Sequence, residues 1–304
     1  MASSIPGSAT PDAAPPGRRA PRAASARSHW AIGARRLLRH RGAIAGAAVG
    51  ALFLLGALLA PRLAPYDPVE PHFGFRLQPP SQAFPFGTDS FGRDVFSRLL
   101  YGGRISLSVG LISVVLQFIL GVPLGVAAGF WGGRVDDAIM RVIDVWLAFP
   151  GLLLALGIVA VLGPGLQNVM LAIGIESVPG VARLIRGSVL SIKEEAYIEV
   201  ARAVGGRDGH IIRAHILPNI LAPAVVLLTL RLGTAILTGV GLSFLGLGIQ
   251  PPAPEWGAMV AEGRAYLREA WWVSTIPGGA IFLGVMGFNL LGDGLRDALD
   301  PRLH

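Results

Sequence analysis

Two charged side chains lie in the middle of otherwise apolar stretches, and they are the first candidates for chemistry. These two side chains belong to Glu176 and Arg231. A charge near the centre of a membrane-spanning helix costs about 2.5–3.5 kcal/mol on insertion scales, so such residues usually face a partner or a water-filled cavity. Thr234 and Thr238 follow Arg231 at helical spacing and extend a polar stripe along its helix face. We expect Glu176 and Arg231 to face the protein interior, where they form an ion pair or line a pathway.

A third charged residue, Asp144, stands at the edge of another apolar stretch and has a local explanation. Arg141 precedes it by three residues, a spacing that places both side chains on one helix face. This favours an interfacial anchor over a proton relay. Pro150 and Pro179 are predicted to mark helix kinks, and kinked helices often line transport pathways.

The composition excludes most other chemistry. The 304 residues contain no cysteine, which excludes thiolate metal sites and cysteine nucleophiles. Lys193 is the single lysine and has no glycine before it, so the chain lacks a phosphate-binding loop and cannot be its own ATPase. His210 and His215 form one close pair, but their spacing is expected to splay the side chains apart on a helix. The sequence therefore predicts no catalytic residue, no cofactor and no metal site.

The overall composition indicates a membrane protein. Apolar residues make up 52% and charged residues 15% of the chain, and the mean hydropathy is +0.58, whereas a soluble domain is about 25% charged. A bilayer core of about 30 Å requires roughly 20 mostly apolar residues per helix. We predict an all-α polytopic protein with six transmembrane helices, five clear and one weaker: 43–60, 105–131, 145–162, 221–247 and 273–291, with 166–182 as the weaker stretch.

The distribution of basic residues gives the orientation. With a cytoplasmic N-terminus, the inner segments hold 18 Lys and Arg residues and the outer segments hold 7. Cytoplasmic loops carry the excess of positive charge, so both termini are predicted to be cytoplasmic. Residues 1–42 contain one acid, Asp12, and are expected to form a disordered basic tail that contacts anionic lipid. A transit peptide or a cleaved signal remains an alternative, but a retained membrane anchor is favoured.

One cytoplasmic loop has the features of a docking element. Residues 195–219, which we call the knob, are predicted to form two short helices. The Gly205-Gly206 pair breaks the first helix because glycine readily adopts positive φ. Asp208 is expected to cap the second helix, and Pro218 to interrupt the pattern before the next span. Several apolar side chains have little cytoplasmic core to bury them, and exposed apolar patches usually mark partners: Ile198, Ala201, Val204, Ile211, Ile212 and Ile216.

The knob resembles the EAA loop of ATP-binding-cassette (ABC) importer permeases. The matching residues are Glu199, Ala201, Gly205, Leu217 and Pro218. Four other stretches, in the right order, are similar to the dipeptide/oligopeptide permease family, and the resemblance runs from about residue 30 to the C-terminus. These stretches are Phe86-Gly87-Thr88-Asp89 with Gly92 to Gly102, residues 144–150, residues 242–252 and residues 289–297.

The resemblance implies a non-catalytic permease subunit of an importer in the bacterial inner membrane, with the type I permease core. The implied partners are a second related permease, two cytoplasmic ABC ATPases and an extracytoplasmic substrate-binding protein that could meet residues 248–272, including Trp256. Membrane lipid surrounds the chain, and no nucleic acid is expected to bind. The implied division has a tail (1–42), an N-terminal segment (43–103), a core (104–296) that includes the knob, and a C-terminal tail (297–304).

The resemblance also implies roles for individual residues. The knob would sit in a cleft of an ATPase subunit, where Glu199 and Arg202 set the register by charge and Gly205 allows the turn. At positions 176 and 231 this chain departs from the family, which commonly has an apolar residue and a small or polar residue there. The residues predicted to couple to the ATPase are Glu199, Ala201, Arg202, Gly205, Asp208, Ile216 and Pro218, and those predicted to line the pathway or to be polar residues within the membrane are Asp144, Glu176, Arg231, Thr234 and Thr238.

Two other functions remain open at this point. A proton-coupled secondary transporter could use Asp144, Glu176 and Arg231, but it predicts an internal inverted repeat that we do not see in the sequence. A non-transporting scaffold could use the knob to recruit a soluble partner. An ABC importer of dipeptides, oligopeptides or related small solutes is the main prediction.

Overall fold

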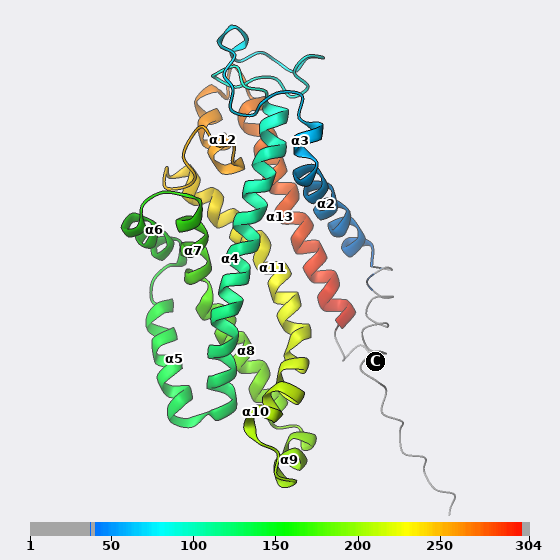
Figure 1. The fold of residues 1–304 in the computed structure, drawn as a ribbon, viewed down its shortest axis with the longest axis vertical. Helices are drawn as coiled ribbons and strands as arrows, with labels where there is room; N and C mark the ends of the chain where they lie inside the picture. Colours follow the sequence, from blue (N-terminus) through cyan, green and yellow to red (C-terminus); the bar gives the residue numbers. More distant parts are fainter. Residues whose placement is uncertain (1–36, 38–39, 300–304) are drawn as a thin grey trace, which may run out of the picture.

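The computed structural model describes residue 37 and residues 40–299, and its regular structure in this part of the chain is helical. Five helices are long and apolar enough to cross a membrane, and a bent pair of helices makes a sixth candidate span. The predicted all-α polytopic fold is thus confirmed for these residues. The long helices follow the long axis of the molecule (Figure 1). The helices are α2 (Arg41–Leu58), α3 (Ala60–Leu63), η1 (Phe73–Phe75), α4 (Val95–Trp131), α5 (Gly133–Leu147), α6 (Gly151–Leu162), α7 (Leu166–Glu176), α8 (Val178–Lys193), α9 (Ala196–Ala203), α10 (Asp208–Ile211), η2 (Ile212–Ile216), α11 (Leu217–Phe244), α12 (Trp256–Gly263), η3 (Arg264–Tyr266) and α13 (Trp272–Leu299).

Helix α4 is the central helix of the bundle and begins before the predicted start at residue 105. Asp94 caps it by accepting a hydrogen bond from the Ser97 backbone N–H at 2.8 Å. Small residues let α8 approach closely, as is common between membrane helices. A Cβ on Gly125 would lie only 2.5 Å from the Ala182 carbonyl oxygen. Helices α4 and α8 therefore form one closely packed unit.

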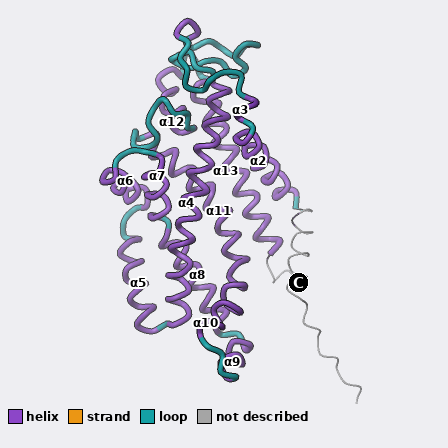
Figure 2. Tube along the Cα trace, in the orientation of Figure 1, coloured by secondary structure: helices purple, strands orange, loops and turns teal. Residues whose placement is uncertain are grey.

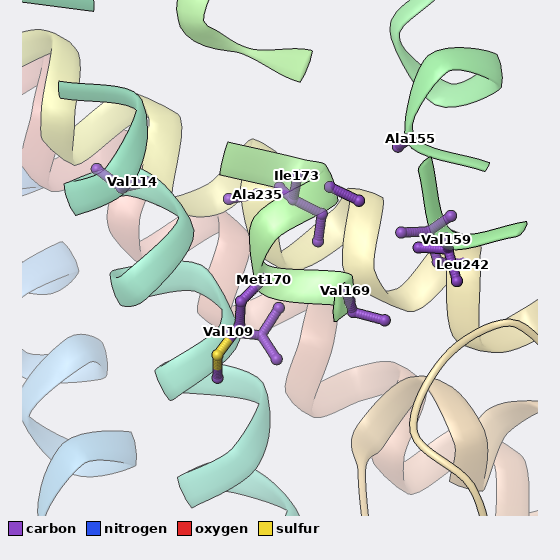
Figure 3. Packing of buried hydrophobic residues seen from close by; sticks show 10 residues of the cluster. Val109, Val114, Ala155, Val159, Val169, Met170, Ile173, Ala235 and Leu242 are labelled. Atoms are coloured by element: carbon purple, nitrogen blue, oxygen red, sulfur yellow. The ribbon is translucent and has the colours of Figure 1, made fainter. Parts of the chain in front are cut away.

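A hydrophobic core lies where α4, α6, α7 and α11 meet (Figure 3). Each of these helices contributes buried aliphatic side chains, so the core joins helices that are distant in the sequence. The core residues are Val109, Val114, Ala155, Val159, Val169, Met170, Ala172, Ile173, Ala235 and Leu242.

The span predicted at 145–162 is not one continuous helix, and this prediction was wrong. Helix α5 ends at Leu147, α6 begins at Gly151, and the two axes differ by 85°. Pro150 lies at the break. It has no backbone N–H, and its ring disfavours helical conformation in the preceding residue. The kink predicted at Pro150 is therefore confirmed, and it is sharper than a simple bend.

The weaker predicted stretch, 166–182, belongs to a longer span. Helices α7 and α8 together form the 28-residue span Leu166–Lys193, interrupted at Ser177. Pro179 lies in the first turn of α8, where its missing N–H has no helical partner to lose. The sequence underestimated this span because Glu176 and the charges after residue 182 reduce its apparent hydropathy.

The two described ends of the chain lie at the same end of the bundle. His40, before α2, is 3.4 Å from the Asp297 carboxylate near the end of α13. Helix α9 projects from this end, whereas many of the loops gather at the opposite end (Figures 1 and 2). The predicted tails 1–42 and 297–304 fall mostly outside the described residues. Their described parts continue into α2 and α13, because Arg41 begins α2 and Leu299 ends α13.

Candidate functional site

The knob turns at the predicted glycine pair. Gly205 has a φ of +86°, and a Cβ at this position would meet open space. Gly206 donates its N–H to the Ala201 carbonyl oxygen at 2.9 Å, and a Cβ there would lie 2.6 Å from the same oxygen. Glycine is therefore favoured at 205 by conformation and required at 206 by space. The predicted break between two short helices is confirmed.

The second half of the knob differs from the prediction. Asp208 lies in the first turn of α10 and makes no capping hydrogen bond, because Arg207 is the N-cap residue. The helix also continues through Pro218. The Leu217 N–H donates to the Ile212 carbonyl oxygen in a π-type turn, and Pro218 falls in the first turn of α11. The expected cap at Asp208 and interruption at Pro218 were therefore wrong.

This π-type turn also brings the two knob histidines together. The rings of His210 and His215 have centroids 6.1 Å apart, and the Tyr197 ring is 5.9 Å from His215. The expected splaying was wrong because a π-type turn aligns residues that are five apart. Burial, with the Glu195 carboxylate nearby, raises the pKa of the Tyr197 phenol, so the phenol stays neutral. Among the residues described, no group of three or more His, Cys, Asp or Glu side chains could hold a metal ion.

One face of the knob is buried in the protein's own core. Ile198, Ile211 and Ile216 are fully buried and pack in a cluster that includes Phe130 and Ile185. The expectation that these isoleucines lack a core was therefore wrong. The side chain of Ile216 holds the knob to the bundle and is not available to a partner.

Charged side chains reinforce this attachment at the end of α4. The Lys193 ammonium donates a hydrogen bond to the Phe130 carbonyl oxygen at 2.7 Å, where a cation also complements the helix dipole. The Arg202 guanidinium lies over the Phe130 ring, 5.3 Å from its centroid. The knob is thus fixed to α4 and α8 rather than loosely tethered.

The other face of the knob is exposed. Val200 and Val204, one helical turn apart on α9, are 61% and 79% exposed. Glu199, Arg202 and Asp208 are exposed as well, and Ala201 is half-buried; Gly205 and Pro218 are also exposed. The knob therefore presents an apolar pair surrounded by charges, which is the composition of a docking surface.

The two intramembrane charges lie on facing helices. Glu176 accepts a hydrogen bond from the Ser177 hydroxyl at 2.7 Å, and a Cβ on Gly151 would lie 2.5 Å from its carboxylate. The Arg231 guanidinium lies against Gly180, where a Cβ would overlap it. The ion pairs found among residues 40–299 do not include one between Glu176 and Arg231.

The threonines beside Arg231 are satisfied within their own helix. The Thr234 hydroxyl donates to the Arg231 carbonyl oxygen at 2.9 Å, and the Thr238 hydroxyl donates to the Thr234 carbonyl oxygen at 3.0 Å. Thr234 is exposed and Thr238 is half-buried. Their oxygens remain free to accept hydrogen bonds from a ligand.

Asp144 has a different partner from the one predicted. Its carboxylate is 2.6 Å from the guanidinium of Arg183 on α8, not that of Arg141. Nearby, Arg186 donates to both carboxylate oxygens of Asp136, at 2.5 and 2.6 Å. The two pairs tie α5 to α8. Sequence analysis chose Arg141 because only partners close in the sequence are visible to it.

A groove between α8 and α11 was not predicted. It encloses about 980 Å³ and also contacts the end of α13. Leu184 lies four residues after Gly180 and Leu230 immediately precedes Arg231, and the rest of the lining combines apolar side chains such as Ile192 with small or polar residues. These include Gly187, Ser188, Ser191, Asn219 and Arg296.

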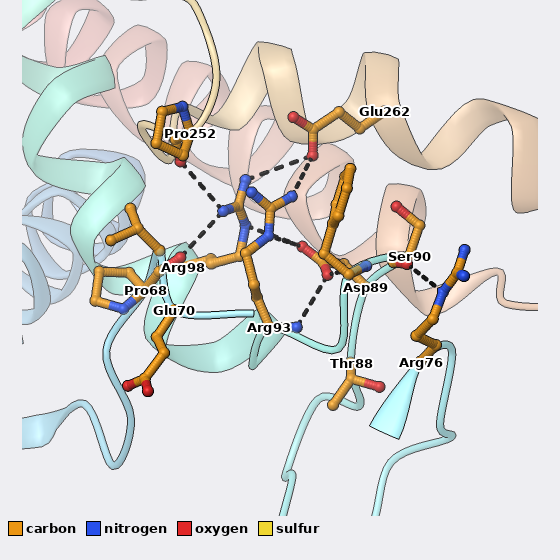
Figure 4. Close-up of polar contacts among 12 residues, drawn as sticks. Pro68, Glu70, Arg76, Thr88, Asp89, Ser90, Arg93, Arg98, Pro252 and Glu262 are labelled. Carbon is orange, nitrogen blue, oxygen red and sulfur yellow. Dashed lines mark hydrogen bonds and ion pairs between the residues drawn. The ribbon is translucent and has the colours of Figure 1, made fainter. Parts of the chain in front are cut away.

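At the opposite end of the molecule, a buried ionic cluster holds the loop before α4 to α12 (Figure 4). Arg93 is 2.6 Å from Asp89 and 2.9 Å from Glu262, and Arg98 is 3.4 and 3.5 Å from the same two acids. Sequence analysis noted the motif that contains these residues but gave the charges no role. The i, i+4 spacing of Asp89 and Arg93 was the available signal.

Trp256 does not offer its ring to a partner. It is 1% exposed, and its indole N–H donates to the Leu99 carbonyl oxygen at 2.9 Å. Its predicted contact with a binding protein is therefore replaced by a role in anchoring α12 to α4.

Two family models match the chain. The model described as "Binding-protein-dependent transport system inner membrane component" matches residues 121–304. The model described as "N-terminal TM domain of oligopeptide transport permease C" matches residues 28–80. The chain belongs to the binding-protein-dependent transport permeases. It is a multi-pass inner-membrane protein, and the predicted family is confirmed.

Individual relatives of this permease cover nearly its whole length. The dipeptide transport system permease protein DppC of Alkalihalophilus pseudofirmus is 48% identical over 91% of both chains. The glutathione transport system permease protein GsiD of Pectobacterium atrosepticum is 48% identical over 92% of this chain and 93% of the relative. The di/tripeptide transport system permease protein DppC of Pseudomonas aeruginosa is 48% identical over 87% and 89%.

A solved structure shares the fold. A chain of the MetNI methionine ABC transporter in an inward-facing conformation matches with a TM-score of 0.55 and 20% identity. The match covers 67% of this permease and 96% of that chain. The predicted ABC importer permease fold is confirmed.

Proposed function

We propose that this permease is the membrane subunit of an ATP-driven importer that carries di- or oligopeptides or related small solutes into the cytoplasm. The observation that carries the proposal is the knob, a docking surface held rigidly against the membrane helices of a transport permease. The names of the relatives, which include dipeptide, di/tripeptide and glutathione systems, support a peptide as the solute. No observation favours the secondary transporter or the scaffold.

The partners follow from this function. ATP hydrolysis takes place on two separate ABC ATPase subunits, each of which receives one knob. A second, related permease completes the pathway, and an extracytoplasmic binding protein delivers the solute to the end opposite the knob. The knob and both described ends share one side of the bundle, and the excess of basic residues makes this side cytoplasmic.

The packing of the knob explains how its movement would reach the pathway. Ile198, Ile211 and Ile216 lock the knob into a core shared with α4 and α8, and α10 continues through the π-type turn into α11. A displacement of the knob by an ATPase is therefore passed directly to α8 and α11. Because these two helices line the groove, rigid-body movement of the knob would change its opening.

On the knob, the exposed residues carry the contact with the ATPase. Glu199, Arg202 and Asp208 supply charge, and Gly205 supplies the turn. Pro218 adds an exposed apolar ring, whereas Ala201 and Ile216 act from within by supporting this shape. In the pathway, Glu176 and Arg231 present charge, Thr234 and Thr238 present hydroxyl oxygens, and Asp144 holds α5 against α8.

The N-terminal segment 43–103 has a separate role at the extracytoplasmic end. The loop before α4 exposes aromatic rings, and the ionic cluster fixes this loop to α12. Phe73, Phe75 and Phe91 are the most suitable residues of this loop for contact with a binding protein, because all three are exposed. The core, 104–296, then contains the pathway and the knob.

Co-purification tests the proposed function. The parent chain, expressed with its neighbouring genes, is expected to retain a nucleotide-hydrolysing partner in mild detergent. A variant with Val200→Asp and Val204→Asp is expected to lose that partner while remaining in the membrane. Arg268→Gln, an exposed substitution at the opposite end, serves as the control. Retention of the partner by the double variant would contradict the docking role of the knob.

A further inference from the structure

Glu176 and Arg231 differ from the neighbouring charges in how they are neutralised. Arg183 and Arg186, on the same span as Glu176, each have a carboxylate partner on α5. Within the described residues, neither Glu176 nor Arg231 makes an ion pair, and both side chains are half-buried. A charge inside a membrane span is costly, so it usually faces an opposite charge or a water-filled cavity. These two charges are therefore free to bind a solute.

The two charges lie close together along one span. Arg231 rests against Gly180, which follows Glu176 by four residues, or about one helical turn. The two parts of the span, α7 and α8, are not sharply bent relative to each other. The charges are of opposite sign and do not approach within the 4.0 Å of an ion pair. The two opposite charges are therefore not paired with each other.

Two glycines make room for these charges. A Cβ on Gly180 would overlap the Arg231 guanidinium, and a Cβ on Gly151 would lie 2.5 Å from the Glu176 carboxylate. Even an alanine at either position would move the charged group. The backbone of α6 and α8 thus sets where each charge can lie.

The groove begins close to this pair along α8 and α11. Of its lining residues, Leu184 lies one turn beyond Gly180 on α8 and Leu230 immediately precedes Arg231 on α11, whereas Gly180 and Arg231 do not themselves line the groove. Its volume of about 980 Å³ is within the range of about 300–1,000 Å³ that holds small ligands. A dipeptide in the groove would therefore lie beside the helix segments that lead to the two charges.

We propose that Glu176 and Arg231 form a subsite for the two charged termini of a zwitterionic peptide. The planar Arg231 guanidinium donates paired hydrogen bonds to the terminal carboxylate, and the Glu176 carboxylate accepts from the terminal ammonium. Each charge of the peptide then meets an opposite charge where water is scarce. The proposal rests on the proposed function, because it assigns the substrate chemistry of the same pathway.

Uptake of capped peptides tests the subsite. The assembled transporter is reconstituted in vesicles, and uptake of dialanine, N-acetyl-dialanine and dialanine amide is measured for parent and variants. Each result is expressed as the ratio of variant to parent for the same peptide, so the selectivity of the unchanged binding protein cancels. The ATPase rate of each complex reports assembly, and Arg268→Gln is the matched control for loss of an arginine.

Each variant has its own expected pattern. Arg231→Gln should reduce uptake of the two peptides with a free carboxylate by about tenfold or more, and that of the amide by less than about twofold. Glu176→Gln should instead reduce uptake of dialanine and dialanine amide, which both carry a free terminal ammonium. Uptake of N-acetyl-dialanine should be spared. Gly180→Ala, which keeps the guanidinium but displaces it, should repeat the Arg231→Gln pattern more weakly.

Other outcomes are equally decisive. Equal loss for all three peptides, no loss for any, or a selective loss in only one of Arg231→Gln and Glu176→Gln would overturn the subsite. If the parent complex takes up dialanine no faster with ATP than without it, the proposed function itself fails. The two failures are therefore distinguishable.

Discussion

Different forces stabilise the structure at the two ends of this permease. At the knob, aliphatic side chains and a continuous helix join the docking surface to the bundle, and its charges stay at the surface. At the opposite end, two arginines and Asp89 are buried beside the partly exposed Glu262, between a loop and α12. Burial of apolar surface tolerates small displacements, whereas a buried ion pair depends on each partner. The comparison indicates a knob that is built to transmit movement. The ionic cluster of Asp89, Arg93, Arg98 and Glu262, which we call the cap, is built to keep its shape.

The largest expected effect on stability is at the cap. Asp89→Leu would leave Arg93 and Arg98 buried with only Glu262 between them, and removal of one buried partner typically destabilises by about 3–5 kcal/mol. We expect a loss of this size in the free energy of unfolding, measured by denaturant titration in detergent.

The exposed pair of Asp144 and Arg183 is the matched control for the cap. Both side chains are more than half exposed, so Arg183→Leu should change the free energy of unfolding by less than about 1 kcal/mol. Similar losses for the two variants would remove the distinction between a buried and an exposed cluster.

A large effect on transport, with a smaller one on stability, is expected at the turn of the knob. Gly205→Trp places a side chain where φ is +86° and where the protein itself leaves open space. The strain is about 1–2 kcal/mol, but the indole would project into the docking surface. We expect ATP-dependent uptake to fall while the protein remains in the membrane.

Gly205→Asn is the control for the turn, because asparagine tolerates positive φ better than other non-glycine residues and is smaller. It should retain most of the uptake. Normal uptake by Gly205→Trp would show that this turn does not face an ATPase.

The smallest expected effect on stability is on the exposed face of α9. Val200→Asp removes an exposed side chain and should change the free energy of unfolding by no more than about 0.5 kcal/mol, yet it should weaken binding of the ATPase. Ile198→Ala, on the buried face of the same helix, should cost about 2–5 kcal/mol. If the two variants change stability equally, the two faces of α9 do not differ as the structure indicates.

Local features of this fold were visible in the sequence. The kink at Pro150 and the turn at Gly205 were predicted from single residues. Proline restricts the backbone conformation at its own position and glycine allows additional ones, and neither effect depends on the rest of the chain. The number of spans followed from hydropathy alone. Five ordered motifs were enough to identify the family.

Features that depend on distant residues were not visible. Arg93 and Glu262 meet although they are 169 residues apart, and Asp144 pairs with Arg183 on another helix. The π-type turn before α11 has no sequence signature, and it reversed the expectations for Pro218 and for the histidine pair. The burial of Ile216 depends on how α8 and α11 pack, which no local pattern reveals.

Reconstitution in vesicles tests the central claim most directly. The chain alone, without added subunits, is compared with the complete transporter supplied with ATP and the binding protein. If ATPases drive this permease through its knob, only the complete transporter should accumulate dialanine against a gradient. Accumulation by the chain alone would contradict the account.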